Sequence, residues 1–188
     1  MPYIKCPTCA VTTYCVTHED CPCCGKRLST TAPAGPMPRL GVDRSLLDVL
    51  ALARARTGAD AAIVSEIRDG HETVREIDQD GAFPSLVTGV SAPLDETICE
   101  RLLSGRIGNL VTDVRADPDL GALPMVQAAH IGAYLGMPLT AADARTYLLC
   151  CIARAARRDL GEDEVRFVRG LAGRVRATLD VAGPVPFI

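Results

Sequence analysis

The sequence predicts an α/β (α+β) domain preceded by a small cysteine-rich module that folds around a metal ion. Hydrophobic residues make up 48% of the 188 residues, which is enough for a packed core, and aromatic residues are only 4%, so that core is aliphatic. After about residue 41, segments with helical periodicity alternate with shorter strand-like segments. Six of the nine cysteines lie between Cys6 and Cys24, in a segment with few apolar residues.

The cysteine-rich module, residues 1–28, carries the spacing of one tetrahedral zinc site. Cys6 and Cys9 form one C-x2-C knuckle, and after eleven residues Cys21 and Cys24 form a second. Two such knuckles give four thiolates around one ion. Because the segment is too polar for a core of its own, bound zinc would supply its folding free energy. Four cysteine ligands leave no open position for a catalytic water.

Other cysteine assignments stay open within this module. Cys23 is an alternative to Cys24, and Cys15 with His18 forms a C-x2-H pair. Two zinc sites would need about eight ligands, whereas six cysteines and one histidine give seven, so we expect one zinc per chain. A disulfide cluster in a secreted domain is the competing interpretation. The first residues lack the basic start and apolar run of a signal peptide, so we expect a cytoplasmic protein.

Composition also limits the partners. The formal net charge of −3 argues against a surface that binds nucleic acid through a basic coat. The longest apolar run, Tyr147 to Ala153, has seven residues, far below the roughly 18 that a membrane helix needs. We therefore expect no membrane partner and do not favour nucleic acid.

The first half of the larger domain follows a Pro- and Gly-rich linker over residues 29–40. Asp43 is a candidate N-cap for a helix that continues to about Arg56. A strand is expected over residues 59–67. Asp69-Gly70 is a hairpin turn signal, and the returning strand is expected over residues 71–77.

The second half contains further alternating elements. A helix is expected over residues 94–104 and a short strand over 109–113. Residues 116–124 have the composition of a loop. Strands are expected over 131–139 and 146–154, separated by a polar turn.

A final helix is expected over residues 162–179, before a tail at residues 182–188. Three acidic residues in its first turn complement the helix dipole. Its apolar residues repeat with spacing 3, 4, 3, 4: Val165, Val168, Ala172, Val175 and Leu179. This spacing is typical of a coiled-coil seam between two chains, and equally of a helix that packs one side on its own core.

Three segments resemble a GAF domain, in the bacterial subset often attached to cyclic-dinucleotide enzymes. Residues 105–113 (GRIGNLVTD) are similar to the middle of such domains. Residues 131–139 (IGAYLGMPL) resemble a family strand, and residues 147–151 (YLLCC) resemble the "yGtLCc" strand that follows it. The resemblance covers about residues 41–181. Leu148 departs from the pattern, since it stands where the family often has glycine. The N-terminal module, with its C-P-x-C-G second knuckle, resembles a zinc ribbon.

The GAF resemblance implies an antiparallel sheet flanked by helices. It implies terminal helices on one face, often forming a homodimer, and a small-molecule pocket on the other. By resemblance, the pocket would include Asp113, Met125, His130, Tyr134 and Cys150. The implied function is a non-catalytic sensory or regulatory protein that signals through a protein partner, with the zinc ribbon as docking or output surface.

Two other functions remain as alternatives. The first is a nucleic-acid-binding regulator that uses the zinc ribbon. The second is a thiol enzyme similar to free methionine sulfoxide reductases, which are also GAF-like, with Cys99 as the reactive thiol and Cys150 or Cys151 as its partner. The simpler interpretation of Cys99 is a small buried residue. Cys150 and Cys151 are adjacent on one strand, so we expect them to face opposite sides of the sheet.

Known chromophore and catalytic patterns are missing. Cys99 is followed by Glu100 rather than the histidine usual at a bilin attachment site, and a haem ligand would have to be His130 or His71. The sequence contains no nucleophilic triad motif, P-loop or dinucleotide fingerprint. We therefore expect no catalysis.

Overall fold

The computed structural model describes residues 3–5, 12–14, 44–142 and 144–182. The expected linker lies outside these ranges, and so does the expected tail apart from Ala182, which ends the last helix. So do all the residues considered above as zinc ligands: Cys6, Cys9, Cys15, His18, Cys21, Cys23 and Cys24. Within the described ranges, no helix combines the length and apolar character needed to cross a membrane.

An antiparallel sheet of six strands organises the larger domain, as expected from the resemblance. The strand order is β5-β4-β3-β8-β7-β6, and each neighbouring pair is antiparallel. In chain order the strands are β3 (Ala61–Arg68), β4 (His71–Gln79), β5 (Ser91–Pro93), β6 (Leu110–Val111), β7 (Ala133–Thr140) and β8 (Thr146–Ala153). The hairpin turn between β3 and β4 is confirmed, because Asp69 and Gly70 both have positive φ, 50° and 73°, as a type I′ turn requires.

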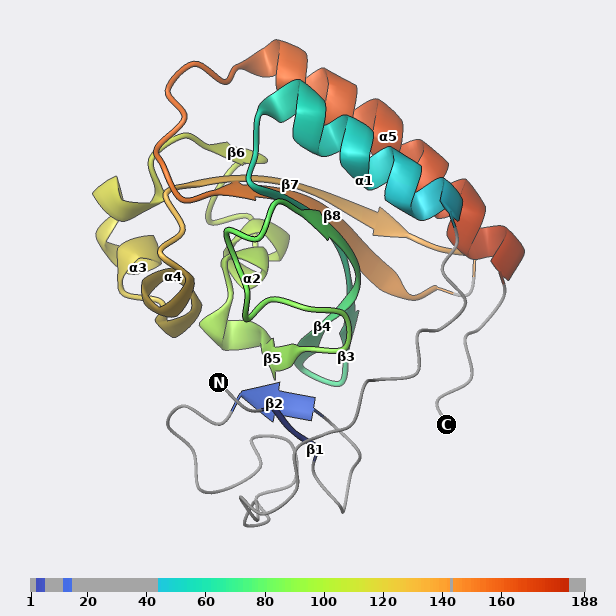
Figure 1. Ribbon diagram of the computed structural model, residues 1–188, viewed down its shortest axis with the longest axis horizontal. Helices are drawn as coiled ribbons and strands as arrows, with labels where there is room; N and C mark the ends of the chain where they lie inside the picture. Colours follow the sequence, from blue (N-terminus) through green and yellow to red (C-terminus); the bar gives the residue numbers. More distant parts are fainter. Residues whose placement is uncertain (1–2, 6–11, 15–43, 143, 183–188) are drawn as a thin grey trace.

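Two long helices cover one face of the sheet, which we call the helical face. Helix α1 (Arg44–Thr57) and helix α5 (Glu162–Ala182) lie side by side there (Figure 1). The apolar repeat of α5 points into the helical-face core: Val168 and Val175 are 0% exposed, and Val165 and Ala172 are also buried. Of the two interpretations of this repeat, the structure therefore shows packing on the chain's own core.

Short helices cover the opposite face, which we call the pocket face (Figure 1). The expected loop over residues 116–124 is wrong, because this region is largely helical. The elements are η2 (Val114–Ala116), α3 (Pro118–Gly121) and α4 (Pro124–Ala129). Asp117 starts α3 by accepting hydrogen bonds from the backbone N–H groups of Asp119 and Leu120, at 2.9 and 3.2 Å. A proline then fills the first position of α3 and of α4, where a missing N–H costs nothing.

The helix expected over residues 94–104 is divided in two. A 3-10 turn, η1 (Leu94–Glu96), precedes α2 (Ile98–Leu103). Thr97 separates them because its backbone is extended and its side chain accepts from the N–H of Glu100, at 3.4 Å, as an N-cap. The strand expected over 109–113 shortens to Leu110–Val111, and β5 was not expected at all.

Side chains on β8 alternate between the two faces. Leu148 and Cys150 belong to the pocket-face core, whereas Leu149 and Cys151 belong to the helical-face core. The expectation that Cys150 and Cys151 face opposite sides is therefore confirmed. Leu148 is 0% exposed, so the residue that replaces the family's glycine fills space beneath the pocket-face helices.

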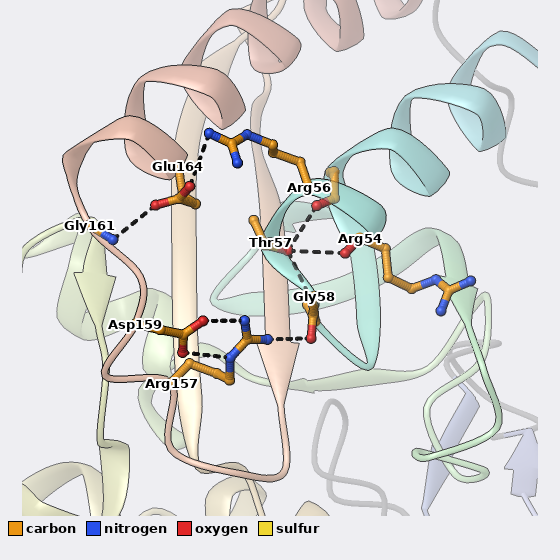
Figure 2. Close-up of polar contacts among 10 residues, drawn as sticks. Arg54, Arg56, Thr57, Gly58, Arg157, Asp159, Gly161 and Glu164 are labelled. Carbon is orange, nitrogen blue, oxygen red and sulfur yellow. Dashed lines mark hydrogen bonds and ion pairs between the residues drawn. The ribbon is translucent and has the colours of Figure 1, made fainter.

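A polar latch ties the end of α1 to the connection between β8 and α5 (Figure 2). Arg157 donates to the backbone carbonyl of Gly58 and pairs with the Asp159 carboxylate at 2.7 Å. Nearby, Glu164 of α5 pairs with Arg56 of α1 at 3.1 Å. Gly58 has a φ of 59°, which favours glycine, and a Cβ there would lie 2.7 Å from the Arg157 guanidinium.

A separate two-stranded hairpin lies near the N-terminus. Strand β1 (Tyr3–Lys5) pairs antiparallel with β2 (Thr12–Tyr14), with Tyr3 opposite Tyr14. Residues 6–11, which connect these strands, lie outside the described ranges.

Candidate ligand-binding pocket

A cavity of about 60 Å³ lies on the pocket face. Its wall comes from β3, β4, β7 and β8 beneath and from α2 and α4 above, together with the segments that flank them. Most of the wall is aliphatic. Four wall residues carry polar groups, and each comes from a different element: Glu72 on β4, Cys99 on α2, Tyr134 on β7 and Cys150 on β8.

These four side chains form one buried cluster. The Cys99 thiol donates to Glu72 Oε1 at 3.1 Å, and its sulfur lies 3.4 Å from the Tyr134 hydroxyl. The Cys150 sulfur lies 3.7 Å from the Cys99 sulfur and 3.5 Å from the Tyr134 hydroxyl. All four residues are at least nine-tenths buried. The topology thus brings together residues up to 78 positions apart (150 − 72) in sequence.

Glycine at position 136 makes room for this cluster. Gly136 lies two residues after Tyr134 on β7, so the two residues share a face of the sheet. A Cβ at Gly136 would lie 2.2 Å from the Tyr134 hydroxyl oxygen and 2.8 Å from a methyl group of Leu102. A side chain at this position would displace the tyrosine from its sulfur partners.

Only one of the two carboxylate oxygens of Glu72 has hydrogen-bond partners among the described residues. Its Oε1 accepts from Ser65 Oγ at 2.8 Å as well as from Cys99. Its Oε2 is buried and has no hydrogen-bond partner among the described residues. No arginine, lysine or histidine side chain belongs to the described wall of the cavity. A buried carboxylate with this environment has spare acceptor capacity.

A second buried carboxylate shows the alternative arrangement. Glu66 on β3 is 2% exposed and contributes to the helical face. Arg75 Nε donates to its Oε2 at 2.6 Å, and Arg145 Nη1 lies 3.6 Å from its Oε1. Glu66 Oε1, like Glu72 Oε2, has no hydrogen-bond partner among the described residues. Unlike Glu72, however, Glu66 has two guanidinium groups beside it, which neutralise its charge from within the chain.

Cys99, Cys151 and Tyr134 keep their protons at neutral pH. The hydrogen bond to Cys150, together with burial, holds the pKa of Cys99 well above its ordinary value. Burial, with the neighbouring sulfurs, raises the pKa of Tyr134 in the same direction. On the helical face, burial raises the pKa of Cys151 to about 12. Since the thiolate is the reactive form of cysteine, these thiols are hydrogen-bonding groups rather than activated nucleophiles.

The five pocket residues expected from the sequence divide into two groups. Met125, Tyr134 and Cys150 lie in the cavity wall. Asp113 instead pairs with Arg158 at 2.8 Å, and His130 is exposed at the C-terminal end of α4, where its φ is 56°. Neither of these two belongs to the described wall.

His71, the other histidine considered as a haem ligand, lies at the start of β4. Its Nδ1 is 3.0 Å from the carbonyl oxygen of Asp69. It is not part of the cavity wall. The described residues also contain no group of three or more His, Cys, Asp or Glu side chains arranged to hold a metal ion.

Sequence reasoning missed the two residues that define the polar end of the cavity, Glu72 and Ser65. A signal existed, because residues two apart on a strand share a face, and Val74 is an apolar residue among polar neighbours in the sequence. That spacing puts Glu72 on the buried side with Val74. The bulge between Val64 and Ser65 changes the register of the hairpin, and this could not be deduced from the strand pattern alone.

The family model for the GAF domain matches residues 42–179. The chain belongs to the GAF domain family. The buried cluster and cavity thus lie inside the GAF domain, between its sheet and its short helices. No curated protein matches the chain.

Solved GAF domains share this fold at low sequence identity. The GAF domain of PixJ from Thermosynechococcus elongatus, in its blue-light-absorbing form, has a TM-score of 0.59 and 20% identity, and the match covers 74% of this chain and 86% of that one. The second GAF domain of DevS from Mycobacterium smegmatis has a TM-score of 0.54 and 18% identity, covering 74% and 93%. The GAF region of a putative membrane protein from Geobacter sulfurreducens has a TM-score of 0.53 and 20% identity, covering 73% and 97%. At these identities, the similarity shows the fold alone.

Proposed function

We propose that this protein is a non-catalytic sensory or regulatory protein whose GAF domain binds a small molecule in the cavity of the pocket face. The main support is a single observation: an aliphatic cavity that ends in a buried carboxylate oxygen with no partner among the described residues. Small-molecule sites characteristically combine an apolar wall with a few placed polar groups. GAF domains in general serve as sensory or ligand-binding regulatory domains. Binding would shift an existing equilibrium between arrangements of the long helices.

The thiol-enzyme alternative has one observation in its favour, the 3.7 Å separation of the Cys99 and Cys150 sulfurs. The raised pKa of Cys99 opposes it, because a buried protonated thiol is a poor nucleophile. Incubation with free methionine sulfoxide and a dithiol reductant tests the alternative. We expect no turnover; turnover that is lost in Cys99→Ser would establish the enzyme instead.

The N-terminal segment is proposed to be a zinc ribbon that binds one zinc through Cys6, Cys9, Cys21 and Cys24 and serves as docking or output surface for a protein partner. The spacing of the cysteines supports this, and so does the antiparallel pairing of the strands on either side of the first knuckle. Nucleic-acid binding through the ribbon is the alternative. It predicts oligonucleotide affinity that falls steeply with salt, and we expect no such binding.

A homodimer through the terminal helices is also part of the proposal. Since the apolar repeat of α5 is buried within the chain, the dimer would use the outer sides of α1 and α5. Leu52 on α1 is 46% exposed and Phe167 on α5 is 37% exposed. Light scattering should find a dimer at tens of micromolar that Phe167→Asp converts to a folded monomer. A wild-type monomer would exclude this part of the proposal.

Native mass spectrometry of the full chain, with and without a chelator, tests the proposed function. We expect one zinc per chain, lost with the chelator, and an additional bound mass that remains after the metal is removed. Denaturation should release the bound molecule for identification. A GAF domain that never retains or binds any small molecule would argue for a purely structural role.

A further inference from the structure

The unpartnered oxygen of Glu72 points to the chemical class of the ligand. A carboxylate buried away from water is costly unless it is paired and hydrogen-bonded. Glu72 receives only neutral donors, the Ser65 hydroxyl and the Cys99 thiol, and both go to the same oxygen. Its Oε2 is left without a donor from the described residues.

The remaining polar groups of the wall do not donate a hydrogen bond to Glu72 Oε2. The Tyr134 hydroxyl lies between the Cys99 and Cys150 sulfurs, at 3.4 and 3.5 Å. The raised pKa values of Cys99 and Tyr134 keep these two groups neutral. No cationic side chain belongs to the described wall, so nothing in the cavity complements an anion such as a phosphate or carboxylate.

The volume limits the size of the ligand. A cavity of about 60 Å³ holds roughly four to six groups of the size of a water molecule, at about 10–15 Å³ each. Apart from Glu72 and its neighbours, those groups would contact aliphatic side chains. A molecule of matching shape has a short apolar body and one strong hydrogen-bond donor.

We infer that the cavity binds a small organic cation, a protonated primary amine with a short alkyl body, whose ammonium group donates to Glu72 Oε2. This rests on the proposed function and specifies its ligand. A charge-assisted hydrogen bond from an ammonium is about twice as strong as one between neutral groups. It would supply both the missing donor and the missing positive charge, while the alkyl body fills the aliphatic part of the cavity.

Three four-carbon probes separate the possibilities: n-butylamine, 1-butanol and butanoate, titrated into the full chain at pH 7.5 and matched ionic strength, with binding followed by NMR. We expect n-butylamine to bind at least tenfold more tightly than 1-butanol, and butanoate not to bind. Glu72→Gln keeps the shape of the side chain, and in this variant n-butylamine and 1-butanol should bind with about equal affinity. The affinity for 1-butanol should stay within twofold.

Two further variants locate the effect. Asp95→Asn removes the same charge at an exposed position outside the cavity wall, and it should keep the preference for the amine. Ala129→Trp puts a large side chain into the wall, and it should abolish binding of both amine and alcohol. Circular dichroism verifies that each variant is folded.

The outcomes distinguish this inference from the proposed function. Equal binding of amine and alcohol, unchanged in Glu72→Gln and lost in Ala129→Trp, would leave a ligand-binding pocket but overturn the cationic class. Binding that survives Ala129→Trp would place the probes elsewhere and overturn the inference. Tighter binding of butanoate, or no binding of any probe at 50 mM, would also overturn it.

Discussion

Among the described residues, each face of the sheet buries one carboxylate, and only the carboxylate on the helical face has cationic neighbours. On the helical face, Glu66 is surrounded by the guanidinium groups of Arg75 and Arg145. On the pocket face, Glu72 has two neutral donors, and no cationic side chain belongs to the described wall around it. One oxygen of each carboxylate has no hydrogen-bond partner among the described residues, so the counter-charge is what distinguishes the two. Both residues belong to the same hairpin, so the difference arises from the direction of the side chains and not from their position along the sheet.

The surroundings of the two carboxylates differ in the same way. The helical-face core is formed mainly by Val, Leu and Ala side chains of α1, α5 and the sheet. The pocket-face core contains a cavity and the sulfur and hydroxyl groups that line it. This contrast supports the proposal that the Glu72 carboxylate binds a ligand, whereas the Glu66 carboxylate stabilises the fold.

The largest effect is expected from a charge placed in the helical-face core. Val168→Asp should lower the free energy of unfolding by about 4 kcal/mol or more, because the buried aspartate would have no partner. Arg169→Asp, at the next, exposed position of α5, should change it by no more than about 0.5 kcal/mol. Urea unfolding measures both. A stable, folded Val168→Asp monomer would mean that the apolar repeat of α5 is a dimer seam after all.

A smaller loss is expected when the structural carboxylate is neutralised. Glu66→Gln should cost about 2–3 kcal/mol, because two partly buried guanidinium groups lose their counter-charge. Thermal unfolding measures this, with Asp95→Asn as the exposed control. If both variants have the melting temperature of the wild type, the ion pairs of Glu66 do not stabilise the fold, and the contrast between the two faces disappears.

Alkaline pH should weaken the domain through its buried thiols. The pKa of Cys151 is raised to about 12, so above pH 9 the unfolded chain releases this proton while the folded chain retains it. Stability is therefore full below pH 9 and falls toward pH 12, by at most about 1.4 kcal/mol per pH unit from this group. Urea unfolding at pH 8 and pH 10 gives the loss in the free energy of unfolding between these pH values. This loss should be smaller by roughly 1.4 kcal/mol in Cys151→Ala than in the wild type. An equal pH dependence in the two proteins would argue against burial of this thiol.

The smallest loss is expected at the polar latch of Figure 2. Arg157→Ala removes the hydrogen bond to the Gly58 carbonyl and should cost about 1 kcal/mol. Arg158, which is 79% exposed in its ion pair with Asp113, provides the matched control, and Arg158→Ala should change stability by less than about 0.5 kcal/mol. Thermal unfolding of the two variants measures both losses of stability. A larger loss in Arg158→Ala than in Arg157→Ala would contradict a stabilising role for the polar latch.

Much of the architecture followed from periodicity and turn chemistry. The Asp69-Gly70 turn, the long helices and the opposite directions of Cys150 and Cys151 all follow from local rules. The helices of residues 114–129 were missed because their apolar contacts lie across the domain, and because Pro118 and Pro124 suggest a loop when the capping geometry is unknown.

The candidate site was less accessible from the sequence. Resemblance to the family indicated Met125, Tyr134 and Cys150, which do line the cavity. It did not indicate Glu72, whose importance depends on what surrounds it. The absence of a partner for its Oε2 is a property of the assembled fold among the described residues, since Ser65, Cys99 and Glu72 come from three different elements.

The most direct test of the contrast between the faces is the thermal stability of Glu72→Gln without any ligand. Gln keeps the acceptor for Ser65 and Cys99 and removes the charge that has no counter-charge in the described wall. We predict a melting temperature equal to or above that of the wild type, the opposite of Glu66→Gln. A fall as large as that of Glu66→Gln would contradict the proposal that the Glu72 charge is kept for a ligand.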